Sequence, residues 1–184
     1  MEIKITTSQI LKSLHLFSWI IFIALCIEAG ALLFNTIYTF VYSPAAAKFF
    51  YKQLNFENLL QSNPSYFITL LSIMLIIATL KAILFYLIIW YFSKTKQMHS
   101  KPFTIYLYQF VKNSSLCSLG IALFSNWGTK FSSFLTKNNY IIPNLEQLNF
   151  SGASIWLFFA LFLFVISQVL KKGIEIQEEN ELTI

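Results

Sequence analysis

Long apolar runs separated by shorter polar segments dominate the sequence. They predict helices over about residues 16–42, 66–92, 103–124 and 153–170. A helix that crosses a bilayer needs about 20 mostly apolar residues, and its backbone groups must be paired within the segment itself. The runs do not alternate in polarity as the strands of a membrane barrel do. The pattern therefore predicts an all-α integral membrane bundle of four transmembrane helices, forming a single domain over residues 1–184.

The connections between these predicted helices differ in kind. A short basic turn, SKTKQMHSKP, joins the second and third. The two other connections, residues 43–65 and 126–152, are long, and such loops usually have structure or function of their own. The apolar residues of the first long loop predict a short amphipathic helix lying on the membrane; they are Phe49, Phe50, Leu54, Leu59 and Leu60. The second mixes aromatic residues with Asn and Gly, and we expect it to fold over the outer mouth of the bundle.

Composition supports the membrane class. The chain is 57% hydrophobic and 11% charged, whereas soluble domains carry about 25% charged residues. The net charge of +5 comes from scattered Lys that flank apolar runs, which the positive-inside rule explains better than nucleic-acid binding does. With the N-terminus inside, the inner side holds Lys4, Lys12, Lys94, Lys96, Lys101, Lys171 and Lys172, and the outer side Lys48, Lys52, Lys130 and Lys137. This bias predicts an N-in/C-in protein. All 13 bases are Lys and all 8 acids are Glu, which is typical of an AT-rich bacterial genome, so we expect a bacterial cytoplasmic membrane.

One acid, Glu28, interrupts the first apolar run. Counted along straight helices, Glu28 lies about 18 Å and Lys81 about 16 Å from the same membrane surface. A lone charge at the bilayer centre costs at least about 2.5–3.5 kcal/mol, so we expect the two to face each other. Their pair has two interpretations: it fixes how the helices pack, or it belongs to a functional polar site for ions or a small polar ligand.

The third predicted helix carries further polar residues. Lys112 and Asn113 lie about 13 Å past Phe103 along a straight helix, and we expect them to extend the cluster of Glu28 and Lys81. The alternative is that Lys112 reaches the cytoplasmic surface along its own aliphatic chain.

Motifs for enzyme chemistry are absent from the sequence. Zinc hydrolases need paired His such as HExxH, but His15 and His99 are the only two. The chain contains no Asp, no GxSxG turn and no CxxC pair, and Cys26 and Cys117 are expected to be small core residues. We therefore expect a protein that is not an enzyme, with no metal and no cofactor.

The sequence ends in an acidic segment, GIEIQEENELTI, which is read either as a solvated tail over residues 173–184 or as a continuation of the last helix. Acids near a helix C-terminus oppose its dipole, so a continued helix needs compensating charge. The segment resembles the ending of a bacterial four-helix membrane-protein family known as domain of unknown function 2975. The matching positions are Gly173, Gln177, Glu178, Glu181, Leu182, Thr183 and Ile184, together with Pro102 and Phe103 at the start of the third helix.

The resemblance implies a four-helix layout and no defined activity. Some relatives are encoded beside small helix-turn-helix regulators, which implies a sensing or regulatory pair. Two hypotheses follow. The first is a non-enzymatic regulatory membrane protein whose acidic tail docks a small cytoplasmic regulator, or which associates with itself as a homo-oligomer. The second is a small ion- or solute-transporting protein that uses the cluster of Glu28, Lys81, Lys112 and Asn113.

Overall fold

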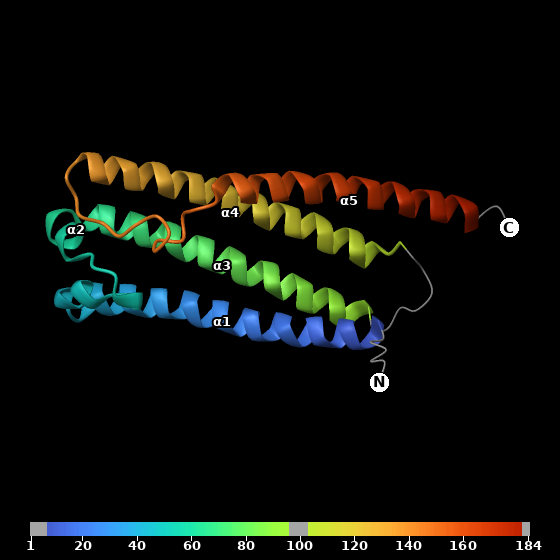
Figure 1. The fold of residues 1–184 in the computed structure, drawn as a ribbon, viewed down its shortest axis with the longest axis horizontal. Helices are drawn as coiled ribbons and strands as arrows, with labels where there is room; N and C mark the ends of the chain where they lie inside the picture. Colours follow the sequence, from blue (N-terminus) through green and yellow to red (C-terminus); the bar gives the residue numbers. More distant parts are fainter. Residues whose placement is uncertain (1–6, 96–102, 182–184) are drawn as a thin grey trace, which may run out of the picture.

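A computed structural model describes residues 7–95 and 103–181 (Figure 1). Long helices dominate it: α1 (Thr7–Val41), α3 (Pro64–Thr95), α4 (Ile105–Lys137) and α5 (Ala153–Glu181). Between α1 and α3 lie the short helices η1 (Pro44–Phe49), η2 (Tyr51–Gln53) and α2 (Glu57–Ser62). Some residues singled out by the sequence lie outside the described ranges; they are Lys4, Lys96, His99, Lys101, Pro102, Leu182, Thr183 and Ile184.

The long helices form an open row rather than a closed bundle. In the described ranges α1 packs on α3, α3 on α4, and α4 on α5, and no contact joins α1 to α4 or α5. Figure 1 shows the same order from α1 along one edge to α5 along the other. Both edge helices therefore have one long helical neighbour and expose long apolar faces, such as those that carry Phe34 and Phe158.

Among the described helices, three are long and apolar enough to cross a membrane, over Gln9–Val41, Pro64–Lys94 and Ala153–Asn180. The chain is therefore a multi-pass membrane protein. The fourth long helix, α4, does not belong to this set. Its polar residues are the reason: Ser114, Ser115 and Ser118 are buried on one face, and Lys112 and Asn113 are exposed on another.

The helix α4 ends at Lys137, well past the predicted end at residue 124. Apolar residues become sparser after Phe124, but a buried stripe continues at helical spacing with Ser125, Gly128, Ser132 and Leu135. Hydroxyl groups in this part donate to carbonyls one turn earlier, as Ser133 does to Thr129. Small residues let neighbouring backbones approach closely, and Leu135 joins the buried core, so both kinds of contact sustain the second half of the helix.

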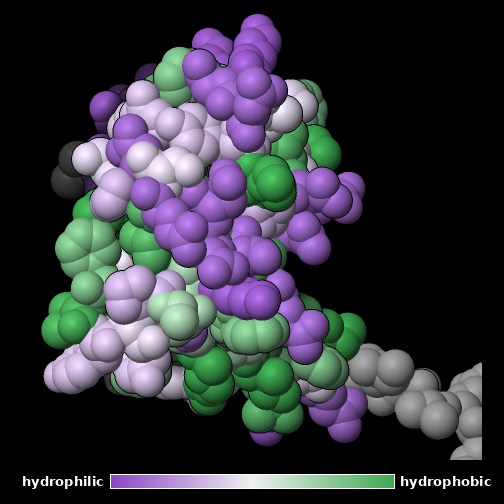
Figure 2. Space-filling model, turned by 90° about the vertical axis from the view of Figure 1, so that its left-hand side faces the viewer, coloured by the Kyte–Doolittle hydropathy of each residue, from purple (hydrophilic) through white to green (hydrophobic). Residues whose placement is uncertain are grey.

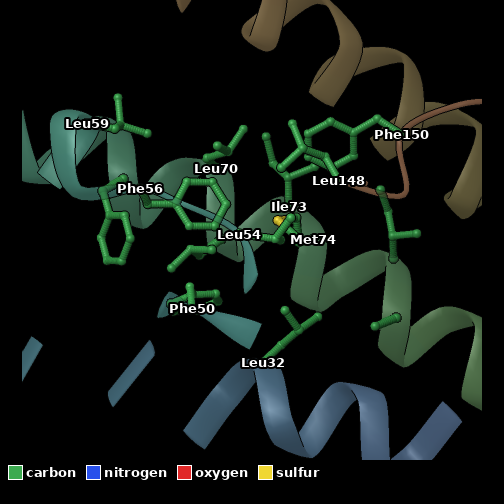
Figure 3. Close-up of a cluster of buried hydrophobic side chains, with 14 of the residues drawn as sticks. Leu32, Phe50, Leu54, Phe56, Leu59, Leu70, Ile73, Met74, Leu148 and Phe150 are labelled. Atoms are coloured by element: carbon green, nitrogen blue, oxygen red, sulfur yellow. The ribbon is translucent and has the colours of Figure 1, made fainter. Parts of the chain in front are cut away.

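The first long connection packs inside the protein. Phe50, Phe56 and Phe67 are all at most 1% exposed, and their rings meet edge to face with centroids 5.3 to 6.2 Å apart. Leu54 and Leu59 are buried in the same cluster (Figure 3). A short helix does form here, α2, which carries Leu59 and Leu60. Its predicted place on the membrane is wrong for Phe50, Leu54 and Leu59, because α3 supplies the apolar partner that the membrane was expected to supply.

The second long connection, residues 138–152, folds back along α3 and α4 before α5 begins (Figure 1). Leu148 and Phe150 are fully buried, and the Phe150 ring lies directly over Gly128. The predicted fold of this loop over one end of the helices is thus confirmed for residues 138–152, whereas residues 126–137 belong to α4. Together the two connections and the helix ends that they cover form an outer cap, defined here as residues 31–77 and 123–152. Its end face is rich in hydrophilic residues (Figure 2).

Candidate functional site

The carboxylate of Glu28 lies on the face of α1 that the cap covers. The Lys52 ammonium donates a hydrogen bond to Glu28 Oε1 at 2.8 Å. The Asn149 side-chain amide donates to the same oxygen at 3.0 Å. One acid of α1 therefore holds both outer connections, one through Lys52 and the other through Asn149. We call these three residues the Glu28 clamp.

Burial is unequal within the clamp. The side chain of Glu28 is 19% exposed and that of Lys52 is 51% exposed. The hydrogen bond with Glu28 raises the pKa of Lys52, while partial burial opposes this change. Lys52 is therefore a cation throughout the neutral range, and the clamp carries one charge of each sign.

Lys81 lies close to the clamp without joining it. It is half-buried on α3 and interacts electrostatically with Glu28 and Lys52. Among the described residues, Glu28 forms an ion pair with Lys52. Lys81 forms none with Glu28, because its ammonium nitrogen lies more than 4.0 Å from the carboxylate oxygens. The expected direct pair is corrected accordingly. The two residues do lie at a similar height, but the loop that returns from the end of α1 places a lysine nearer to Glu28.

The height of Glu28 also differs from the expectation. Its partner Asn149 lies just before the start of α5 at Ala153. Glu28 is therefore level with the outer end of the apolar stretch of α5, not with its middle. A depth counted from Leu16 is too small, because α1 begins at Thr7.

Lys112 and Asn113 do not join this group of residues. Both side chains are exposed on α4. The Lys112 ammonium lies 5.7 Å from the centroid of the Tyr108 ring, which directs it one turn back toward the start of α4. The structure thus brings Glu28 near Lys81, and it leaves Lys112 and Asn113 on a separate surface.

The acidic tail continues α5 as a helix to Glu181. Lys171 and Lys172 lie 4.0 and 3.4 Å from carboxylate oxygens of Glu175, so part of the charge that opposes the helix dipole is compensated within α5. Gln177 is half-buried, whereas Glu178 is exposed. The side chains that follow Asn180 are outside the described set.

The two segments that carry the family resemblance meet in space. A Cβ atom placed on Gly173 lies 3.2 Å from the Phe103 ring. Thr104 then caps α4, because its side chain accepts a hydrogen bond from the Leu107 amide at 3.2 Å. The glycine of α5 therefore receives the aromatic ring that precedes α4.

We expect Gly173→Leu to push the Phe103 ring out of this contact. The larger side chain occupies the position of the ring, which is 39% exposed and free to move outward. Amide hydrogen exchange in the first turn of α4 should then rise several-fold, because its approach to α5 is loosened. Gly173→Ala is the matched control: its single methyl needs only a small shift, and alanine favours the helix by about 1 kcal/mol. Equal exchange in Gly173→Leu and in the unchanged protein contradicts the role given to this contact.

Sequence reasoning missed Lys52 and Asn149 as partners of Glu28. Both have a positive φ, of 57° and 61°. Asn adopts this conformation more readily than most residues, so Asn149 carried a weak signal for a turn. Nothing in the local sequence indicated how far back along α1 the two loops return. Within the described ranges no group of His, Cys, Asp or Glu is suited to hold a metal ion.

Comparison with known proteins places the chain in a family without assigning an activity. No curated protein and no solved structure matches it. Residues 44–184, from the start of η1 to the end of the chain, match a family described as "Protein of unknown function (DUF2975)". The matched region contains Lys52, Lys81 and Asn149, whereas Glu28 precedes it. Because the match covers about three quarters of the sequence, the chain belongs to this DUF2975 family of membrane proteins.

Proposed function

We propose that the chain is a non-enzymatic regulatory protein of a bacterial cytoplasmic membrane, and that the cytoplasmic end of α5 docks a basic protein partner. The observation that carries the proposal is the continuity of α5, which runs as one helix from the cap through its apolar stretch to the acidic residues up to Glu181. A single helix of this kind presents an ordered surface at the inner side, where a solvated tail offers none.

The proposal includes a fourth membrane crossing by α4. The Ser115 hydroxyl donates to the Ala160 carbonyl at 2.9 Å, and a Cβ on Gly120 lies 3.1 Å from Leu80. The first half of α4 is therefore level with the apolar part of α5 and with the second half of α3. The helices α3 and α5 flank α4, and both cross the membrane. The helix α4 therefore crosses it as well, and both ends of the chain lie inside.

The charges of the tail favour a basic partner. Glu175 is compensated by Lys171 and Lys172 on its own helix. Glu178 is exposed one turn further on, and no base follows it in the sequence. An acidic surface steers basic partners toward it and disfavours acidic ones. A small regulator with a basic surface has this property.

The ion-coupled carrier receives less support. It requires an assembled intramembrane cluster, but Glu28 is hydrogen-bonded to Lys52 and Asn149 of the cap. Lys112 and Asn113 are exposed on α4. The charged residues near Glu28 therefore support a role in holding the cap.

Site-specific photo-crosslinking tests the docking proposal. A photoreactive residue placed at Asn180, with the full chain in its native membrane, should crosslink to a basic cytoplasmic protein. Glu178→Gln combined with Glu179→Gln should reduce the yield about tenfold, because two charges of the surface are removed. The matched control places the photoreactive residue at Lys137, at the outer end of α4. A yield that the two Gln substitutions leave unchanged, or the same product from Lys137, refutes docking.

A further inference from the structure

The exposed face of α4 is polar at a depth where the neighbouring helices are apolar. Gln109, Lys112 and Asn113 are exposed there, and Leu116 is 55% exposed one turn further on. Their spacing places them on one face of the helix. We call these four residues the α4 stripe. The packing face of α4 is elsewhere, because Ser114, Ser115 and Ser118 are buried.

This face lies within the membrane zone that α5 defines. The link from Ser115 to Ala160 sets the α4 stripe opposite the middle and inner part of the apolar run of α5. Gln109 and Asn113 make no hydrogen bond with any other described residue. Lipid tails supply neither donors nor acceptors, so a bare amide there is unfavourable. The α4 stripe therefore needs a polar cover from another molecule.

We propose that a second copy of this chain covers the α4 stripe, forming a parallel dimer about a two-fold axis along the membrane normal. In such a dimer the same surface meets itself. A carboxamide suits this contact because it holds both a donor and an acceptor, so Gln109 and Asn113 can each pair with the same residue of the second copy. Asn and Gln are known to bond across membrane helices in this way.

The charge of Lys112 is compatible with the dimer. Its ammonium lies 5.7 Å from the Tyr108 ring centroid, toward the cytoplasmic end of α4. A long Lys side chain leads its charge out of the membrane zone in this direction while its aliphatic part stays against the helix. The apolar contact continues outward through Leu123 and Trp127, which are 59% and 52% exposed. The dimer contact is independent of partner docking at the tail.

Disulfide trapping in native membranes tests the dimer. Leu116→Cys is introduced together with Cys26→Ser and Cys117→Ser and then oxidised. The matched control is Leu161→Cys, which stands on α5 near the same depth and has a similar exposed fraction, 58% against 55%. The dimer predicts a covalent product at residue 116 and little at 161. Equal crosslinking at both positions, or none at 116, overturns it.

A second measurement identifies the polar contact. Gln109→Leu with Asn113→Leu should raise the dimer dissociation constant in detergent about tenfold, as expected for loss of interhelical hydrogen bonds. The substitutions are apolar and exposed, so the fold is retained. If the unchanged protein is a monomer in detergent, and retains an anionic phospholipid that Lys112→Gln releases, then lipid covers the α4 stripe and the proposal is wrong.

Discussion

Phe67→Ala should lower the free energy of unfolding by about 3–5 kcal/mol, the usual loss for a fully buried phenylalanine. Phe67 has no exposed surface, and its ring packs edge to face on Phe50 and Phe56. These contacts join α3 to the first outer connection. Phe50 and Phe56 are themselves buried in the same cluster, so they are not free to close around the cavity.

Equilibrium unfolding in mixed detergent measures this loss. Phe158→Ala provides the control, because Phe158 is 71% exposed on α5 and the substitution removes only a stacked contact with Phe162 of the same helix. The control should change stability by much less than 1 kcal/mol in detergent, since surface changes away from packed groups have small effects. If both variants lose similar amounts, the first connection is not packed on α3 as described.

Gly128→Ala should destabilise the protein by about 1–3 kcal/mol, the usual cost of overpacking. A Cβ at this position lies 2.8 Å from two atoms of the Phe150 ring. That ring is fully buried, so it has no space into which it can turn. Displacing the ring also moves the neighbouring Asn149, which donates a hydrogen bond to Glu28.

Gly30→Ala is the matched control for this prediction. A Cβ at Gly30 meets no atom within 4 Å, and alanine favours a helix interior by about 1 kcal/mol over glycine. The same chemical change should therefore stabilise the protein at residue 30 and destabilise it at residue 128. Thermal unfolding followed by circular dichroism separates the two signs. Stabilisation by both substitutions shows that the second connection does not rest on α4.

The apolar runs predicted the long helices because hydrophobicity and membrane crossing are directly related. They predicted the end of α4 poorly, because apolar residues become sparser after Phe124, where small buried residues such as Gly128 and Ser132 alternate with apolar ones such as Leu135. The sequence is compatible with either a helix or a coil in the tail. Gly173 does not end the helix, and the Phe103 ring fills the space beside it.

The partner of Glu28 was less accessible to sequence reasoning. Counting along helices gives the height of a residue, and Glu28 and Lys81 are indeed close to one another. It does not give the path of a loop. Lys52 reaches Glu28 because aromatic residues on both sides, Phe50 and Phe56, anchor the returning segment against α3. That anchor is a tertiary contact, and no local pattern encodes it.

The most direct test of the account is a pair of double-mutant cycles on stability. One combines Glu28→Ala with Lys52→Ala, and the other combines Glu28→Ala with Lys81→Ala. We predict a coupling of about 0.5–1 kcal/mol between Glu28 and Lys52, modest because water screens the half-exposed lysine. The coupling between Glu28 and Lys81 should be clearly smaller. A larger coupling with Lys81 means that Glu28 pairs within the row of helices, and it contradicts the clamp that holds the outer cap.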